Sequence, residues 1–231
     1  MDSHFGLFLI SCTAALGLLA SGLVAAPGAA AQPASDSAAA RTSWYAFPTL
    51  YYTPETSLGG GVAGGYFFPL GAGRPSSLQG DASVTLRSQY ALNLRLELYR
   101  RGGRQRLFGD LALSKYPGVF YGIGPATTEA MDEDFTSRFV DATVQVEQQV
   151  APALRLGVRA RFRHEVVTEV EEGGLLDGSG IPGDEGSTAS GVGPVVTRDR
   201  VFYPRRGQYV TAYALVHGRW LGSTFDFSRF V

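Results

Sequence analysis

Apolar and polar residues alternate strictly along two neighbouring stretches near the middle of the chain. In the first stretch, apolar residues separate the polar side chains of Asp141, Thr143, Gln145 and Glu147. In the second, which follows the break at Ala151-Pro152-Ala153, apolar residues separate the guanidinium groups of Arg155, Arg159, Arg161 and Arg163. A period of two predicts β-strands with one apolar face.

Two fold classes contain strands of this kind. A soluble sandwich turns the apolar face of each strand toward its core and leaves the charged face in water. An outer-membrane barrel turns the apolar face toward lipid, and its polar side chains line the lumen. Further features of the chain are needed to separate these two classes.

The same alternation, interrupted by turn residues, continues over most of the chain and predicts an all-β fold. Thirty glycines, eleven tyrosines and fourteen phenylalanines against two methionines also favour strands and turns over helices. The predicted architecture is an antiparallel transmembrane β-barrel with about ten strands present. These strands are expected at residues 43–52, 58–68, 81–87, 89–99, 106–115, 135–150, 154–167, 187–197, 208–217 and 222–231.

The N-terminal region predicts export from the cytoplasm. Residues 5–26 form a mostly apolar run without charge, and Ala29-Ala30-Ala31 offers small residues for cleavage. We therefore expect a signal peptide at 1–31, a flexible leader at 32–42 and the barrel domain at 43–231. The sole cysteine, Cys12, lies in the signal peptide, so the mature chain would have no disulfide and no thiolate metal site. An exported all-β chain of this kind is typical of the bacterial outer membrane.

The two longest connections have the positions and the charge of outer loops. The fifth and seventh connections are residues 116–134 and 168–186. If the first strand starts in the periplasm, both of these connections fall on the outer side. The short turns at 151–153 and 200–207 then fall on the periplasmic side. The long connections contain ten acidic residues and no Lys or Arg. These carboxylates are either solvated or bind divalent cations that bridge lipopolysaccharide phosphates.

The charged residues of the two alternating stretches are predicted to line the lumen. Asp141 and Glu147 are expected to face the arginines of the following strand and to form cross-strand pairs that set the register. The alternative is a ladder of arginines that conducts anions. The whole chain has 20 basic and 21 acidic residues, so its charge does not indicate a nucleic-acid partner.

Residues 191–207 resemble the strand-turn signature of the BamA/TamA-type bacterial surface antigen barrels. The matching positions, in order and spacing, are Arg198, Asp199, Phe202, Tyr203, Pro204 and Gly207. Residues 222–229 are similar to the family's next strand. In such a turn, Pro204 fixes φ, Gly207 permits a positive φ, and Asp199 can accept hydrogen bonds from the amides of the turn.

This resemblance implies a role in outer-membrane biogenesis, through protein insertion or translocation at a weak seam between the first and last strands. The implied partners are outer-membrane lipid, lipopolysaccharide and client membrane proteins, and the implied mechanism uses no catalytic residue, cofactor or metal. Family barrels have sixteen strands and usually follow periplasmic POTRA domains. Only the short leader precedes residue 43 here, so a separate periplasmic module would have to replace those domains. Ten strands would form an incomplete barrel or, alternatively, a complete smaller one.

Motifs of enzymes are scarce in the chain. Residues 59–64 fit the G-x-G-x-x-G pattern, but a strand follows them where a nucleotide-binding site requires a helix. A lipid hydrolase would need Ser190 or Ser223 beside His164 or His217, which is the weakest of the hypotheses. A passive pore or a surface-binding barrel without assembly activity is the main alternative to biogenesis.

Overall fold

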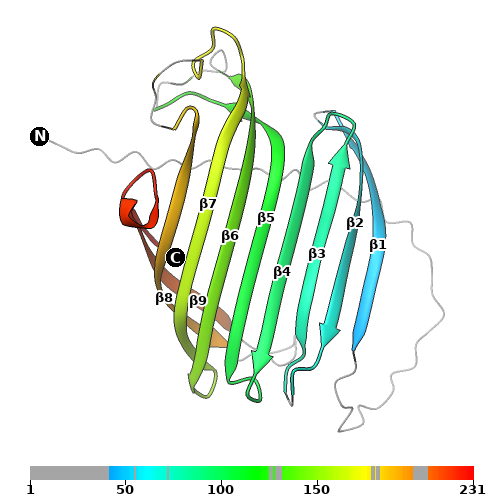
Figure 1. The fold of residues 1–231 in the computed structure, drawn as a ribbon, viewed down its shortest axis with the longest axis vertical. Helices are drawn as coiled ribbons and strands as arrows, with labels where there is room; N and C mark the ends of the chain where they lie inside the picture. The colour runs from blue at the N-terminus through cyan, green and yellow to red at the C-terminus, as the bar shows by residue number, and fades with distance from the viewer. Residues whose placement is uncertain are drawn as a thin grey trace, which may run out of the picture.

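Ten strands pair in the order in which they follow one another in the chain. The computed structural model describes residues 42–54, 56–71, 73–124, 127, 132–177, 180, 183–199 and 208–231. The strands are β1 (Ser43–Thr53), β2 (Ser57–Phe68), β3 (Ser76–Thr85), β4 (Tyr90–Arg100), β5 (Gln105–Phe120), β6 (Glu133–Ala151), β7 (Leu154–Val170), β8 (Gly186–Asp199), β9 (Tyr209–His217) and β10 (Phe227–Phe230). They form one antiparallel sheet in the order β1 to β10 (Figure 1). The expectation of an all-β antiparallel fold is confirmed.

Three strands differ by about five residues from their predicted positions. The fifth ends at Phe120, five residues later than expected, because it stays paired with β6 as far as Glu133. The third begins at Ser76, five residues earlier than expected, because Ser77 and Leu78 pair with both β2 and β4. The tenth is limited to Phe227–Phe230, because a short 3-10 helix, η2 (Arg219–Leu221), and a turn at Gly222 with φ of 84° precede it. No helix in the described part of the chain is long and apolar enough to cross a membrane.

The register places apolar side chains on one face of the sheet across all ten strands. One row of neighbours on this face runs through Leu96, Gly109 and Val144, and the next runs through Leu107, Val146 and Val158. The apolar side chains are exposed: Val146 and Val158 each have 56% of their surface accessible. The opposite face carries polar side chains, of which Gln145 is 2% and Glu147 1% exposed. Burial is therefore inverted relative to a protein with an apolar core.

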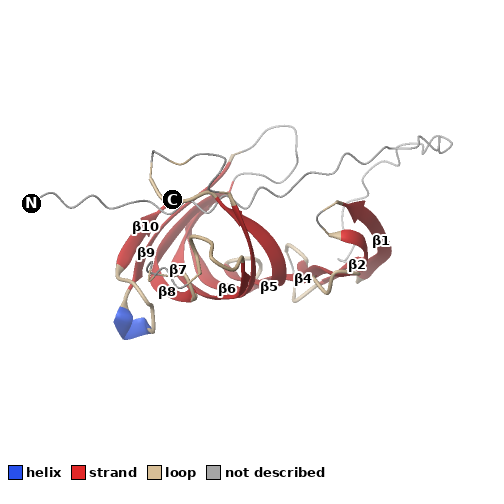
Figure 2. Cartoon of the chain, turned by 90° about the horizontal axis from the view of Figure 1, so that it is seen from above, coloured by secondary structure: helices blue, strands red, loops and turns tan. Residues whose placement is uncertain are grey.

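The sheet is curved, and its polar face is the concave one. Figure 2 shows it end-on as a bent wall, with β1 and β10 at separate edges. The guanidinium of Arg106 on β5 reaches the hydroxyl of Tyr209 on β9, which is possible only if the face that carries both side chains is concave. Among the described strands, β1 pairs only with β2 and β10 only with β9, so the sheet is not closed.

Glycines mark the places where neighbouring backbones approach most closely. A Cβ added at Gly157 on β7 would overlap the carbonyl oxygen of Val146 on β6, and one added at Gly193 would overlap that of Ala214. Glycine in a strand has this use when another backbone lies too near for a side chain. These positions allow β6 to β9 to follow the bend of the wall.

Candidate functional site

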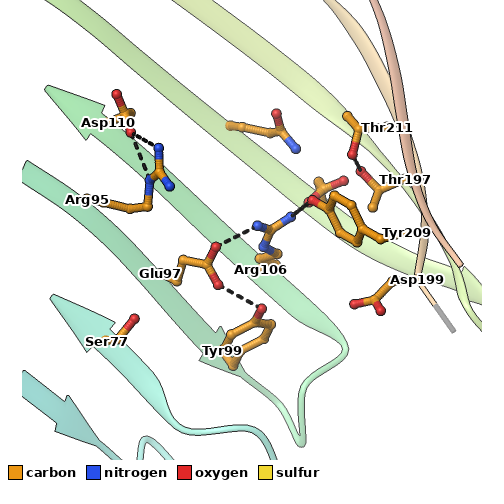
Figure 3. A network of polar contacts seen from close by, with 12 residues as sticks. Ser77, Arg95, Glu97, Tyr99, Arg106, Asp110, Thr197, Asp199, Tyr209 and Thr211 are labelled. Carbon is orange, nitrogen blue, oxygen red and sulfur yellow. Dashed lines mark hydrogen bonds and ion pairs between the residues drawn. The ribbon is translucent and has the colours of Figure 1, made fainter. Parts of the chain in front are cut away.

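A buried cluster of charges lies on the concave face, near the end of the sheet that carries the turn between β4 and β5. Arg106 donates to Glu97 Oε1 at 2.8 Å and to Glu147 Oε2 at 3.0 Å. It also lies 3.3 Å from the hydroxyl of Tyr209 (Figure 3). The Arg106 side chain is 8% exposed and that of Glu147 is fully buried. The single guanidinium therefore pairs with two carboxylates and balances the charge of Glu147, which is fully buried, while the side chain of Glu97 is 26% exposed and reaches solvent.

The sheet register builds this cluster. Arg106 stands opposite Tyr99 on β4 and opposite Glu147 on β6. The hydroxyl of Tyr99 donates to Glu97 Oε2 at 3.0 Å, which fixes that carboxylate beside the guanidinium. On its other side, Glu147 faces Gly157, which has no side chain. The prediction that Glu147 would pair with an arginine of β7 is wrong, because its partner comes from β5.

Asp141 does pair with the arginines of β7. It stands opposite Arg163, and it forms ion pairs with Arg161 and with Arg163, the latter at 3.2 Å. Arg163 also contacts Glu165 at 2.8 Å. Two positions on β7, Arg161 and Arg163, are thereby linked to one carboxylate on β6, as expected for a cross-strand pair that sets register.

The other two arginines of the predicted ladder have no carboxylate partner among the described residues. Arg159 donates to Gln145 Oε1 at 2.9 Å and lies over the ring of Tyr213 at 4.4 Å from its centroid. Arg155 donates to the carbonyl oxygens of Gly103 at 2.6 Å and Arg104 at 3.4 Å. The four arginines are thus held in different ways, and Arg155 serves to fix the turn between β4 and β5.

A second ion pair joins distant parts of the sheet at the end that carries the shorter described turns. Arg74, in the connection between β2 and β3, contacts both carboxylate oxygens of Asp199 at the end of β8, at 2.5 and 3.3 Å. Hydrogen bonding to Asp199 raises the pKa of the Arg74 guanidinium, against the lowering effect of burial. The pair borders a cavity of about 240 Å³ that is lined by Gly73, Arg74, Gly102, Gly103, Gln149, Ala153, Arg155 and Asp199.

The turn motif is only partly described. Asp199 ends β8, and Arg198 stands opposite Val210, on the apolar face. Phe202, Tyr203, Pro204 and Gly207 lie outside the described residues. The hydrogen bonds expected between Asp199 and the amides of the turn therefore stay a prediction, and Arg74 is a partner that the sequence did not indicate.

The acidic connections are joined at the opposite end of the sheet. Glu133, the first residue of β6, is 4% exposed and accepts hydrogen bonds from the amides of Leu175 and Leu176 at 2.5 and 3.1 Å. Asp177 accepts from the amide of Gly173 at 2.9 Å. These carboxylates order the connection between β7 and β8. The described residues contain no group of three or more His, Cys, Asp or Glu side chains that could hold a metal ion.

Among the described residues, no hydrogen bond links the serines considered for a lipid hydrolase to His164 or His217. The hydroxyl of Ser223 binds the backbone of Ser190, donating to its carbonyl at 2.9 Å. His164 Nδ1 lies 2.8 Å from the hydroxyl of Thr188. His217 stacks on Phe227 with ring centroids 4.1 Å apart.

The sequence pattern identified polar positions but not which distant positions meet. The sequence offered one signal for this cluster: the polar positions in the alternating pattern of their strands include Arg106, Glu97 and Tyr209. The contact of Arg106 with Tyr209 depends on the bend of the sheet, which a period of two does not encode.

Comparison with known proteins identifies no relative of this chain. No family model, no curated protein and no solved structure matches the chain. The resemblance to the BamA/TamA-type barrels therefore rests on the sequence motif alone, and the chain is characterised by its fold: an open, curved, ten-stranded antiparallel sheet with exposed apolar and buried polar faces.

Proposed function

We propose that the chain forms the lipid-facing wall of a bacterial outer-membrane β-barrel that acts in outer-membrane biogenesis, by inserting or translocating proteins. The observation that carries the first part is the inverted burial of the sheet. Apolar side chains such as Val146 and Val158 are exposed on the convex face, while Glu147 and Arg106 are buried on the concave face. Lipid would cover the former and a water-filled lumen would face the latter.

The lengths of the strands agree with this proposal. A tilted strand of about 9–11 residues crosses the apolar part of a bilayer. Nine of the ten strands reach that length, from 9 residues in β9 to 19 residues in β6. Only β10, with 4 residues, is shorter.

The open edge of the sheet supports the second part of the proposal. The outer edge of β1, eleven residues long, has no partner among the described strands. An unpaired edge offers a row of backbone donors and acceptors to the strand of another protein. A client strand that adds to β1 would enter the membrane with its backbone already hydrogen-bonded, which removes the main cost of insertion.

A passive pore is the second candidate function. The observation that favours it is Arg159, whose guanidinium lies on the concave face without a carboxylate partner among the described residues. An uncompensated cation on a lumen wall would attract anions. Conductance of single channels in planar bilayers, with a preference for anions that disappears in Arg159→Gln, would support this function over biogenesis.

The lipid-facing wall is tested by placing a charge on the convex face. Val158→Arg should destabilise the protein refolded in lipid vesicles by about 2–4 kcal/mol, which is the cost of arginine near the middle of a bilayer. Leu86→Arg is the control, because Leu86 is 75% exposed in the turn between β3 and β4. If Val158 faces water, its substitution would change the free energy of unfolding by less than about 0.5 kcal/mol, and the proposal fails.

The role in biogenesis is tested separately in the bacterium that encodes the chain. Depletion of the protein should lower the amount of folded outer-membrane proteins, and a chain with Pro substituted for Tyr45 and Phe47 on the edge strand should not restore it. Unchanged assembly after depletion would contradict the biogenesis role while leaving the lipid-facing wall intact.

A further inference from the structure

Three side chains without a carboxylate partner among the described residues, Arg159, His217 and Arg229, stand on the concave face of β7, β9 and β10. Arg159 Nε is buried and has no partner, although its Nη1 binds Gln145. His217 is 3% exposed, and neither of its ring nitrogens has a partner. Arg229 on β10 forms no ion pair among the described residues and is exposed. Buried polar groups without partners mark places where an ion or a water molecule is bound.

The register brings these side chains to one part of the face. Arg159 stands opposite Gly193 on β8, and His217 stands opposite Gly191 on the same strand. Arg229 stands opposite Leu215 on β9. Leu215 is the next residue on the same face of β9 before His217. The two glycines leave β8 without side chains here, and the ring of His217 lies directly over Gly191, 2.5 Å from the place of a Cβ.

The local charge is positive. Arg159 and Arg161 stand on the concave face of β7, opposite Gly193 and Gly191, and Arg229 stands on the same face of β10. Of these cations, Arg161 is committed to Asp141. The carboxylates of Glu97 and Glu147 are occupied by Arg106 on another part of the wall. Arg159 and Arg229 are thus the cations that no acidic residue neutralises by an ion pair in the described structure.

We propose that this part of the concave face binds a phosphate group, held between Arg159 and Arg229 with His217 at its border. Phosphate oxygens accept hydrogen bonds that the guanidinium groups of Arg159 and Arg229 and the one N–H of a neutral His217 can donate, and guanidinium groups match oxyanions in charge and geometry. A tetrahedral phosphate presents oxygens to donors on three strands, whereas a planar carboxylate presents only two. The ligand is water-soluble, because the site lies on the face opposite the apolar one. This site does not depend on a role in biogenesis.

The proposal is tested with the full chain refolded in detergent and titrated with inorganic phosphate by calorimetry. We expect saturable binding by the wild type and affinity at least about tenfold weaker in Arg159→Gln and in Arg229→Gln, since each loses charged hydrogen bonds. Arg159→Lys keeps the charge but loses the planar fork, so its affinity should also fall. Arg95→Gln is the matched control, because Arg95 lies on the same face but pairs with Asp110 at 2.9 Å.

Several results would overturn the proposal. Binding that is not saturable would identify an adventitious ion only, and an equal loss in Arg95→Gln would indicate a general effect of charge. Unchanged affinity in Arg229→Gln would show that phosphate is not held between Arg159 and Arg229. Because Arg229 is exposed, this variant keeps the test valid if Arg159→Gln fails to fold. Micelles that contain phosphatidic acid form a second arm: binding of that lipid without binding of free phosphate would contradict a water-soluble ligand.

Discussion

Arg106 Nη1 lies 3.3 Å from the hydroxyl of Tyr209, although three strands separate the two residues in the sheet. The residues are 103 positions apart in the chain. Arg74 and Asp199, 125 positions apart, meet in the same manner nearer the short turns. Both contacts cross the concave face, so polar side chains on that face hold the bend of the wall.

Removal of Arg106 should destabilise the fold severely. Arg106→Leu leaves Glu147 fully buried without a cation, a change that costs about 3–5 kcal/mol. Urea unfolding in detergent, followed by tryptophan fluorescence, measures this cost. Arg95→Leu is the control, because the Arg95 side chain is 60% exposed and loss of its pair should cost at most about 1 kcal/mol. Equal losses in the two variants would show that the Arg106 cluster is not buried.

Replacement of both members of the buried pair should recover stability. In Arg106→Leu with Glu147→Leu, no fully buried charge is stranded, because the remaining carboxylate of Glu97 is 26% exposed, so the free energy of unfolding should lie above that of Arg106→Leu alone. The same urea experiment gives the coupling between the two positions. Strict additivity of the two single substitutions would mean that the residues do not interact.

Gly157 should not tolerate a side chain, whereas Gly109 should. A Cβ at Gly157 would overlap the Val146 carbonyl oxygen, so Gly157→Ala should cost about 1–3 kcal/mol through separation of β6 and β7. At Gly109 the nearest atom, Leu96 Cβ, would lie 3.6 Å away, which is ordinary contact. Thermal unfolding of Gly157→Ala and Gly109→Ala compares them directly. A Gly157→Ala protein as stable as Gly109→Ala would contradict the close approach of these backbones.

Glu133 should order the connection between β7 and β8. Glu133→Gln weakens the acceptor of the Leu175 and Leu176 amides, so hydrogen exchange at these amides should become faster. Glu172→Gln is the control, because Glu172 lies in the same connection, is exposed and has no hydrogen bond among those described. Identical exchange in the two variants would remove Glu133 from this role.

The open sheet predicts how the refolded chain migrates in gels. A closed barrel resists detergent and runs faster before heating than after it. Because β1 and β10 do not pair, heated and unheated samples should run at the same position. A closed outer-membrane barrel of similar mass, run alongside, shows that the conditions preserve such a fold. A faster unheated band would mean that the two edges are joined in the refolded protein.

The period-two pattern predicted most of the fold because it reports directly on which face each side chain occupies. Val144 and Val158 were predicted on an apolar face, and both lie there. The start of β3 was missed because Ser76 and Ser77 have little preference for strands and are held by pairing with β2. Pairing with neighbours, rather than local preference, decided that boundary.

The site was predictable only between adjacent strands. Asp141 and Arg163 stand opposite each other, so alternation and one turn were enough to predict their pairing. Glu147 differs because Gly157 stands opposite it on β7, and its cation comes from β5. Contacts across the bend, such as that of Arg106 with Tyr209, required the curvature itself.

The sequential order of the strands also has a consequence for how the protein folds. Every ladder joins two strands that are consecutive in the chain, so each pairing closes a short loop at a small cost in entropy. The sheet can grow one hairpin at a time from β1. Arg106 and Glu147 come together once β6 has been added, so the buried charges are neutralised before β9 supplies Tyr209 and completes the bend.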